Sequence, residues 1–178
     1  MPTFPSVQGL RTSTREHQIF VIDGPNMSNL GARNKRVYGA ISSLADLQDL
    51  SKAFGAALGV AVSTFASNFE GAILEFIHQS AASADGFVIN PAGLTQYGVA
   101  TKHALTETGK PFIEVHFANI AAPATAPRGL PIGPWKSEFS PSATGVMMGL
   151  RQYSYCAAIL SLAMALDDQT FLGADLSA

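Results

Sequence analysis

The sequence predicts an α/β fold in which helices cover both faces of a five-stranded parallel sheet. Three observations lead to this class: the chain has five short apolar segments, helical segments alternate with them, and 178 residues suit one domain. Short continuous apolar strands are typical of a parallel sheet that is buried on both faces. We therefore expect an N-terminal tail over 1–16 and a single domain over 17–178.

The individual elements follow from apolar runs, capping patterns and turn residues. We expect strands over 17–23, 60–66, 87–90, 112–117 and 144–150, and helices over 43–58, 67–81, 97–108 and 152–166. Capping boxes are predicted where Ser43 precedes Asp46 and where Ser67 precedes Glu70, and Gly59 is expected to end the first helix. Five prolines before the last strand predict a long loop there.

Composition and charge limit the partners that the chain can have. Hydrophobic residues make up 47% of the chain and charged residues 13%, which favours a homo-oligomer that covers apolar surface. A net charge of −2 gives no field that would attract nucleic acid or a membrane. Without a signal peptide or a run of roughly 18 apolar residues, we expect a cytoplasmic protein. We expect the N-terminal tail to be ordered only against a neighbouring subunit.

Several kinds of catalytic machinery are missing from the sequence. It contains no G-x-x-x-x-G-K-[ST], G-x-G-x-x-G or G-x-S-x-G motif, which disfavours nucleotide phosphates and a serine nucleophile. The four histidines lack metal-ligand spacing, and the single cysteine, Cys156, is expected to be a core residue. All five lysines fall in expected loops or helices, whereas a Schiff-base enzyme would need one buried at a strand end.

The end of the expected strand over 112–117 carries a carboxylate and an imidazole. Glu114 and His116 are two residues apart, so their side chains lie on one face of the strand. A carboxylate orients a neighbouring imidazole and favours its protonated form, which makes a general acid. A structural histidine is the alternative. Ligands in such sheets bind beyond the carboxyl ends of the strands, and this favours the functional interpretation.

A long polar loop after the first strand carries Arg33 and Tyr38. Loops of this length in a compact domain are usually functional or disordered. A guanidinium close to a phenol lowers the pKa of the phenol and makes phenolate accessible as a base. In the alternative, Tyr38 packs as the anchor of a lid and Arg33 is solvated. The spacing alone does not choose between these interpretations.

Neutral polar groups at other strand ends complete the candidate site. Asn26 and Asn90 each follow a strand and could hold a hydroxyl or an oxyanion, although either could simply form a turn. The backbone N–H groups of Phe117 and Ala118 could bind a carboxylate. A base, an acid and neutral donors around a small oxygenated ligand suit elimination of water through an enolate.

Several motifs occur in a fixed order along the chain. They are Gly24-Pro25-Asn26, Leu30-Gly31, Arg33, Tyr38-Gly39, Ser67-Asn68, Glu70-Gly71, Phe76-Ile77-His78, Val88-Ile89-Asn90-Pro91, Glu114-Val115-His116, Asn119, Ser140-Pro141 and Ala143-Thr144-Gly145-Val146. In these motifs, over about 17–166, the chain resembles the type II 3-dehydroquinate dehydratases, or type II dehydroquinases. The resemblance implies a flavodoxin-like three-layer sandwich, trimers assembled into a dodecamer, and no cofactor. It also implies a carbon–oxygen lyase that converts 3-dehydroquinate to 3-dehydroshikimate.

The same resemblance implies a role for each catalytic candidate. Tyr38, activated by Arg33, would abstract a proton alpha to the ketone. Asn26 would help to stabilise the enolate. His116, supported by Glu114, would protonate the departing hydroxyl.

Residues for substrate recognition match the family only in part. Asn90 would hold a substrate oxygen, and the amides of Phe117 and Ala118 would hold the carboxylate. Gln96 stands where the family has a histidine that contacts a ring hydroxyl, and Asp23 stands where it has an asparagine. His103 replaces an acidic residue that reaches a neighbouring active site.

The largest departure is a proline-rich insert in place of the basic F-R-x-H-S segment of the family. The position of the arginine that binds a substrate hydroxyl falls near Trp135, and Arg128 or Lys136 are candidate substitutes. A diverged dehydratase or hydratase acting on another cyclic hydroxy acid or ketone is therefore the alternative function. A non-catalytic oligomer that binds small molecules is a third possibility.

Overall fold

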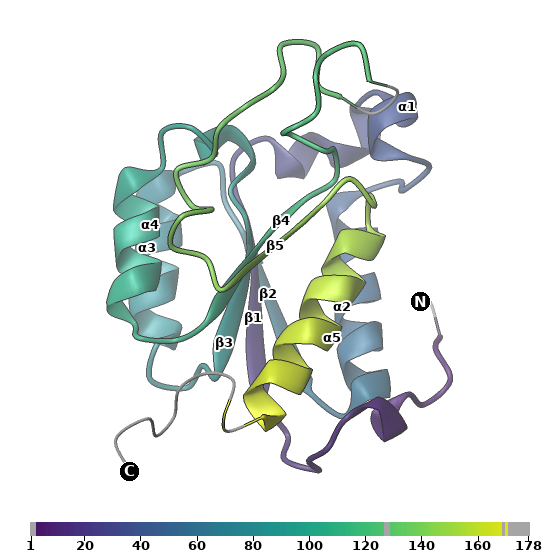
Figure 1. Cartoon of the computed structure of the whole chain (residues 1–178), viewed down its shortest axis with the longest axis vertical. Coiled ribbons are helices and arrows are strands. Elements are labelled where there is room, and N and C mark those ends of the chain that lie inside the picture. The colour runs from purple at the N-terminus through teal and green to yellow at the C-terminus, as the bar shows by residue number, and fades with distance from the viewer. Residues whose placement is uncertain (1–2, 127–128, 169, 171–178) are drawn as a thin grey trace.

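The computed structural model describes residues 3–126, 129–168 and 170, and it forms a three-layer α/β sandwich (Figure 1). Its strands are β1 (Gln18–Asp23), β2 (Ala61–Ala66), β3 (Gly86–Asn90), β4 (Phe112–His116) and β5 (Gly145–Met148), and its α-helices are α1 (Lys35–Tyr38), α2 (Leu44–Leu58), α3 (Glu70–Ser80), α4 (Val99–Glu107) and α5 (Tyr153–Asp167). All four strand pairs are parallel, in the order β2-β1-β3-β4-β5. This doubly wound order is the flavodoxin-like one, so the predicted fold class is confirmed.

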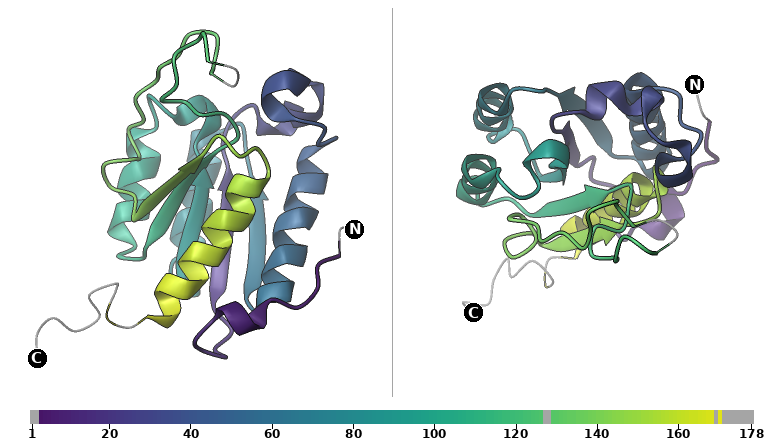
Figure 2. Two further views of the ribbon diagram at one scale, coloured as in Figure 1. Left: turned by 45° about the vertical axis from the view of Figure 1, so that its right-hand side comes forward. Right: turned by 90° about the horizontal axis from the view of Figure 1, so that it is seen from above.

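Helices pack on both faces of the sheet, α3 and α4 on one and α2 and α5 on the other (Figures 1 and 2). Successive residues of β3 point to opposite faces. Val88 joins the cluster under α2 and α5, whereas Phe87 and Ile89 join the cluster under α3 and α4. Because both faces are buried, the strands are apolar along their whole length, as the sequence predicts.

The two predicted capping boxes have different outcomes. The Ser43 hydroxyl oxygen accepts a hydrogen bond from the Asp46 amide at 3.1 Å, which is the N-cap half of the predicted box, and Gly59 ends α2 in the left-handed conformation, as predicted. The second box is not formed. The Ser67 hydroxyl accepts from the Phe69 amide, and the Glu70 carboxylate instead accepts from Thr101 on α4. Glu70 therefore joins two helices rather than capping its own.

Element boundaries differ from the prediction by up to three residues, the largest difference being the start of α3, and the short helical segments were not predicted. β5 ends at Met148 rather than at residue 150, because Gly149 has a φ of 88° and leaves the extended conformation. The short helix α1 lies inside the predicted polar loop, which also contains a 3-10 helix at Met27–Ala32. In the described part of the chain, no helix is both long and apolar enough to cross a bilayer.

The N-terminal tail packs on its own chain, so the expectation that it needs a neighbouring subunit is wrong. The Val7 amide donates to the carbonyl of Ala57, at the end of α2. The Arg11 guanidinium forms a salt bridge of 2.8 Å with Asp167, and both side chains are buried. His17 also bonds to Asp167, at 2.8 Å. These contacts join the tail to the ends of α2 and α5.

Candidate active site

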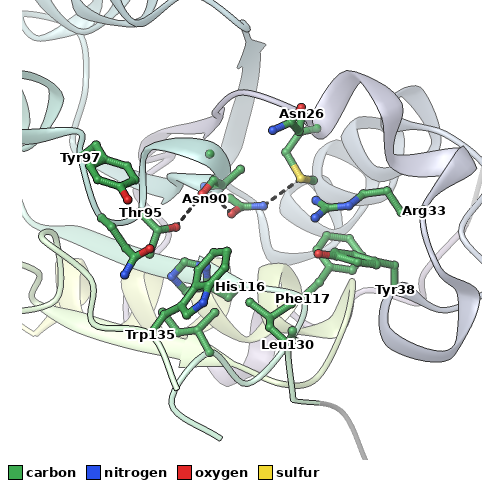
Figure 3. A pocket seen from close by; sticks show the side chains of 16 residues that line it. Asn26, Arg33, Tyr38, Asn90, Thr95, Tyr97, His116, Phe117, Leu130 and Trp135 are labelled. Atoms are coloured by element: carbon green, nitrogen blue, oxygen red, sulfur yellow. Dashed lines mark hydrogen bonds between the residues drawn. The ribbon is translucent and has the colours of Figure 1, made fainter. Parts of the chain in front are cut away.

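The candidate site is a cavity at the carboxyl ends of β1, β3 and β4, next to the switch point in strand order (Figure 3). Its volume of about 150 Å³ is small beside the roughly 300–1,000 Å³ of drug-sized ligand sites, so it suits a single-ring ligand. The described side chains that line it include most of the predicted ones: Asn26, Arg33, Tyr38, Asn90, Gln96, His116, Phe117, Ala118 and Trp135. It is also lined by residues that the sequence did not single out, namely Met27, Ala92, Gly93, Thr95, Tyr97, Ile120 and Leu130.

Glu114 and His116 form the predicted pair on one face of β4. The His116 Nε2 atom lies 2.6 Å from a carboxylate oxygen of Glu114, and both side chains are buried. The other carboxylate oxygen accepts from the Ser140 hydroxyl. Burial raises the pKa of Glu114, but hydrogen bonds from His116, Ser137 and Ser140 outweigh it and leave the pKa below its ordinary value. Glu114 therefore stays ionised and can stabilise an imidazolium, while Nδ1 of His116 remains to act on a ligand.

Tyr38 and Arg33 meet in the cavity through ring stacking. The guanidinium carbon of Arg33 lies 3.8 Å from the centroid of the Tyr38 ring. Burial raises the pKa of Tyr38, and the positive charge of Arg33 lowers it only partly, so the pKa lies above its ordinary value. The predicted lowering effect of the Arg33 charge is therefore present, but partial burial of the phenol has the larger effect on its pKa. Tyr38 also packs on Phe117, with ring centroids 6.0 Å apart.

The two candidate asparagines are held by neighbouring loops and helices. Asn26 has a φ of 76°, and its backbone amide donates to the side-chain oxygen of Asn68 at 2.9 Å. The Asn90 side-chain amide donates to the Tyr155 hydroxyl at 2.8 Å, and its oxygen accepts from the Ala92 amide at 3.1 Å. Each asparagine shapes a turn and also lines the cavity, so the two interpretations of these residues are compatible.

Asp23 lies beneath the cavity in a buried polar network. It is the register partner of Asn90 in the neighbouring strand, and one of its carboxylate oxygens accepts from the Tyr155 hydroxyl at 2.5 Å. Its other oxygen is buried and has no hydrogen-bond partner among the described residues. Burial raises the pKa of Asp23 to about 7. The sequence pointed to Asp23 but not to Tyr155, whose only signal is a tyrosine within an apolar helix 132 residues away.

The remaining recognition residues are only partly gathered at the cavity. Gln96 and Trp135 line the cavity, and so do Phe117 and Ala118, which directly follow β4. Arg128 lies outside the described residues, so its predicted role has no structural counterpart here. No group of three or more metal-ligating side chains occurs in the described ranges.

Comparison with known proteins assigns the chain to a family. A family model described as dehydroquinase class II matches residues 17–163. The chain belongs to the class II dehydroquinase family. It is 38% identical to catabolic 3-dehydroquinase 1 of Neosartorya fischeri over 156 residues, covering 86% of this chain and 97% of that one. It is 39% identical to catabolic 3-dehydroquinase of Aspergillus oryzae over 148 residues, covering 82% and 90%.

A solved structure of the same family has the same fold. The type II dehydroquinase from Propionibacterium acnes superposes with a TM-score of 0.73 at 34% identity, covering 85% of this chain and 99% of that one. Family membership therefore rests on both the sequence and the arrangement of the strands that carry the candidate site.

Proposed function

We propose that the protein is a hydro-lyase that converts 3-dehydroquinate to 3-dehydroshikimate through an enolate. The observation that carries the proposal is that one small cavity contains both the Tyr38–Arg33 pair and the His116–Glu114 pair. Family membership supports the reaction class and the substrate. Acid–base elimination needs only protein side chains, so no cofactor is proposed.

In the first step, Tyr38 removes a proton alpha to the ketone. Burial keeps this phenol mostly protonated at neutral pH, and the guanidinium stacked on its ring increases the accessible share of phenolate. The electrons of the broken C–H bond move to the ketone oxygen and form the enolate. We propose that Asn26, which lines the same cavity, stabilises that oxygen.

In the second step, His116 protonates the departing hydroxyl, which leaves as water. The enolate collapses, the C–O bond breaks, and a conjugated enone is formed. The resulting neutral imidazole is reprotonated from solvent, while Glu114 holds the ring in place through Nε2. Asn90 is proposed to hold a substrate oxygen and the amides of Phe117 and Ala118 the carboxylate.

The activity test follows the ultraviolet absorbance of the enone on addition of 3-dehydroquinate to the purified protein. We expect steady formation of product, identified by NMR. Dialysis of the protein against a chelator should leave this activity unchanged. His116→Asn should reduce the rate strongly, whereas His78→Asn, at an exposed histidine on α3, should leave it unchanged. Tight binding of 3-dehydroquinate without any product would contradict the enzyme and support a binding protein.

The assembly is proposed to consist of trimers joined into a dodecamer. Exposed apolar side chains on the face formed by β5 and α5 support contact between subunits, with Leu150, Tyr153 and Met164 each about half exposed. Light scattering should then give a mass of twelve 18.7-kDa chains. A monomer would contradict this proposal. Cytoplasmic localisation stays a prediction, to be tested by cell fractionation.

A further inference from the structure

The turn between β5 and α5 is bonded to the chain at the proposed acid. The Gly149 amide donates to the carbonyl of His116 at 3.3 Å, and the Arg151 amide donates to the carbonyl of Phe117 at 3.1 Å. In Figure 1 this turn lies at the same end of the sheet as α1. The backbone of Arg151 is therefore joined to the part of the site that carries His116, next to a residue that lines the cavity.

The side chain of Arg151 extends to the segment that carries the proposed base. Its guanidinium donates to the carbonyl of Arg36 at 3.0 Å. Its Cδ atom lies against Gly39, whose φ is 81° and where an added Cβ would be only 2.8 Å from Cδ. A glycine at this position thus admits the stem of the arginine. Arg151 therefore contacts the chain on both sides of Tyr38.

Two features of Arg151 destabilise the fold. Its φ is 57°, a conformation that side chains rarely adopt and that glycine adopts freely. Its Nε atom is buried and has no hydrogen-bond partner among the described residues, so this donor loses its bonds to water without replacement. A glycine would avoid both penalties. Strain of this kind persists where surrounding contacts hold the residue, and it often occurs at functional sites.

The helix α1 needs support from outside itself. It has only four residues, and so short a helix is not stable without tertiary contacts. The amides of Tyr38 and Gly39 are bonded to carbonyls at the start of this segment. The carbonyls of the last four residues of a helix, Arg36 among them, have no partner within the helix. Arg151 supplies a partner for one of these carbonyls.

The charge of Arg151 is not what acts on the phenol. Arg33 is the cation that lowers the pKa of Tyr38, and its guanidinium lies over the ring. Arg151 bonds to backbone instead, and it is not among the described residues that line the cavity. Any effect of Arg151 on the reaction therefore acts through the position of α1.

We propose that Arg151 is a positioning residue that holds Tyr38 in place relative to His116. It does so through its bond to the carbonyl of Arg36 and its packing on Gly39, while its own backbone is fixed beside the end of β4. The inference rests on the proposed function, in which Tyr38 is the base and His116 the acid. Both groups act on one ring, so a small displacement of either reduces the rate.

Arg151→Gly separates positioning from stability. We expect kcat for 3-dehydroquinate to fall about 10-fold with little change in KM, because the groups that line the cavity remain. The Tm should stay the same or rise, because glycine suits the backbone at this position. Arg15→Gly, at a 67% exposed arginine of the N-terminal tail, is the matched control and should leave kcat unchanged. A fall in kcat that follows a loss of Tm would overturn the inference.

Two further variants test the bond to Arg36. Arg151→Met keeps the stem that packs on Gly39 but loses every donor, whereas Arg151→Lys keeps both a stem and a donor. Both variants keep the strained backbone, so their Tm values should be similar. We expect the lysine variant to retain several-fold more kcat than the methionine variant. Equal kcat values in these two variants would overturn the inference.

Hydrogen exchange measures the order of α1 without reference to activity. In Arg151→Gly, the amides of Tyr38 and Gly39 should exchange roughly 5-fold faster, while those of β1 and β4 exchange at the wild-type rate. In a wild-type protein that converts 3-dehydroquinate, unchanged exchange of these two amides or unchanged kcat in Arg151→Gly would overturn the inference. If the wild-type protein forms no product while exchange at α1 still rises in the variant, the proposed function fails and the contact of Arg151 with α1 stands.

Discussion

The proposed acid and the proposed base are held by very different parts of the fold. His116 ends a strand inside the sheet, is 4% exposed, and bonds directly to a buried carboxylate. Tyr38 ends a four-residue helix within a loop and is held by stacking and apolar packing. In Figure 1 this helix lies beside the loop that follows β4, beyond the end of the sheet.

This difference in scaffold is matched by a difference in electrostatics. Around Glu114, hydrogen bonds outweigh burial, so the pKa is lowered and the carboxylate is ionised in the folded protein. Around Tyr38, burial outweighs the charge of Arg33, so the pKa is raised. The acid side is therefore prepared by the fold itself, whereas the base side depends on how closely the loop holds Arg33 and Tyr38 together.

The largest expected effect comes from removing the base. Tyr38→Phe keeps the ring that stacks on Arg33 but deletes the hydroxyl, so kcat should fall by about 10²- to 10⁴-fold with little change in Tm. Tyr153→Phe, at a 62% exposed position on α5, is the control. A loss of less than about threefold in Tyr38→Phe would remove Tyr38 from the mechanism.

The next effect concerns stability on the strand side, where Asp23 is buried. Its pKa is 3.8 in the unfolded chain and about 7 in the folded one, so the folded state holds the proton more tightly. The free energy of unfolding should therefore fall as pH rises from about 4 to about 7, by on the order of 4 kcal/mol, and then level off.

Asp23→Asn removes this titration. Urea unfolding at several pH values should give the variant a nearly constant stability where the wild-type protein loses it. If both proteins have the same pH dependence, Asp23 is not the group that titrates.

A smaller effect is expected from weakening the acid pair. Glu114→Gln keeps the size of the side chain but loses the charge that orients and stabilises protonated His116, so kcat should fall by up to about 10²-fold. Steady-state kinetics should show KM changing much less than kcat. Glu75→Gln, at an exposed position on α3, serves as control, and equal effects of the two changes would refute the pairing.

The smallest effect tests the geometry of the base side. Arg33→Lys keeps the positive charge but loses the planar group that stacks on Tyr38, so kcat should fall by about 10-fold or less. Arg36→Lys, at an exposed position on the same loop, should have no effect. A fall in kcat as large as that of Tyr38→Phe would show that stacking of Arg33, and not its charge, activates Tyr38.

The sequence predicts the part of the site on the strands, with Glu114 and His116, better than the part in the loops, with Arg33 and Tyr38. Glu114 and His116 follow from the period of two in a strand, and the strand ends follow from the parallel architecture. Alternation along β1 and β3 also places Asp23 and Asn90 on the face covered by α5. These are local rules, and they need no knowledge of the rest of the chain.

The loop side depends on contacts that no local rule supplies. Three contacts join distant segments in this way. Tyr155 bonds to Asp23, and Trp135 packs against the cluster of Leu130 and Val37. Arg151 bonds to the carbonyl of Arg36 in α1. The net pKa of Tyr38 likewise depends on how deeply the loop buries it, which spacing in the sequence does not reveal. That is why the sequence predicts the charge effect of Arg33 and the pair on β4, but not the net rise in the pKa of Tyr38.

The most direct test of the mechanism separates its two proton transfers in deuterated water. NMR would follow exchange of the α-proton of 3-dehydroquinate in two variants, His116→Asn and Tyr38→Phe. We predict that His116→Asn still exchanges this proton while forming almost no product, and that Tyr38→Phe does neither. Exchange in Tyr38→Phe at the wild-type rate would contradict the assignment of the base.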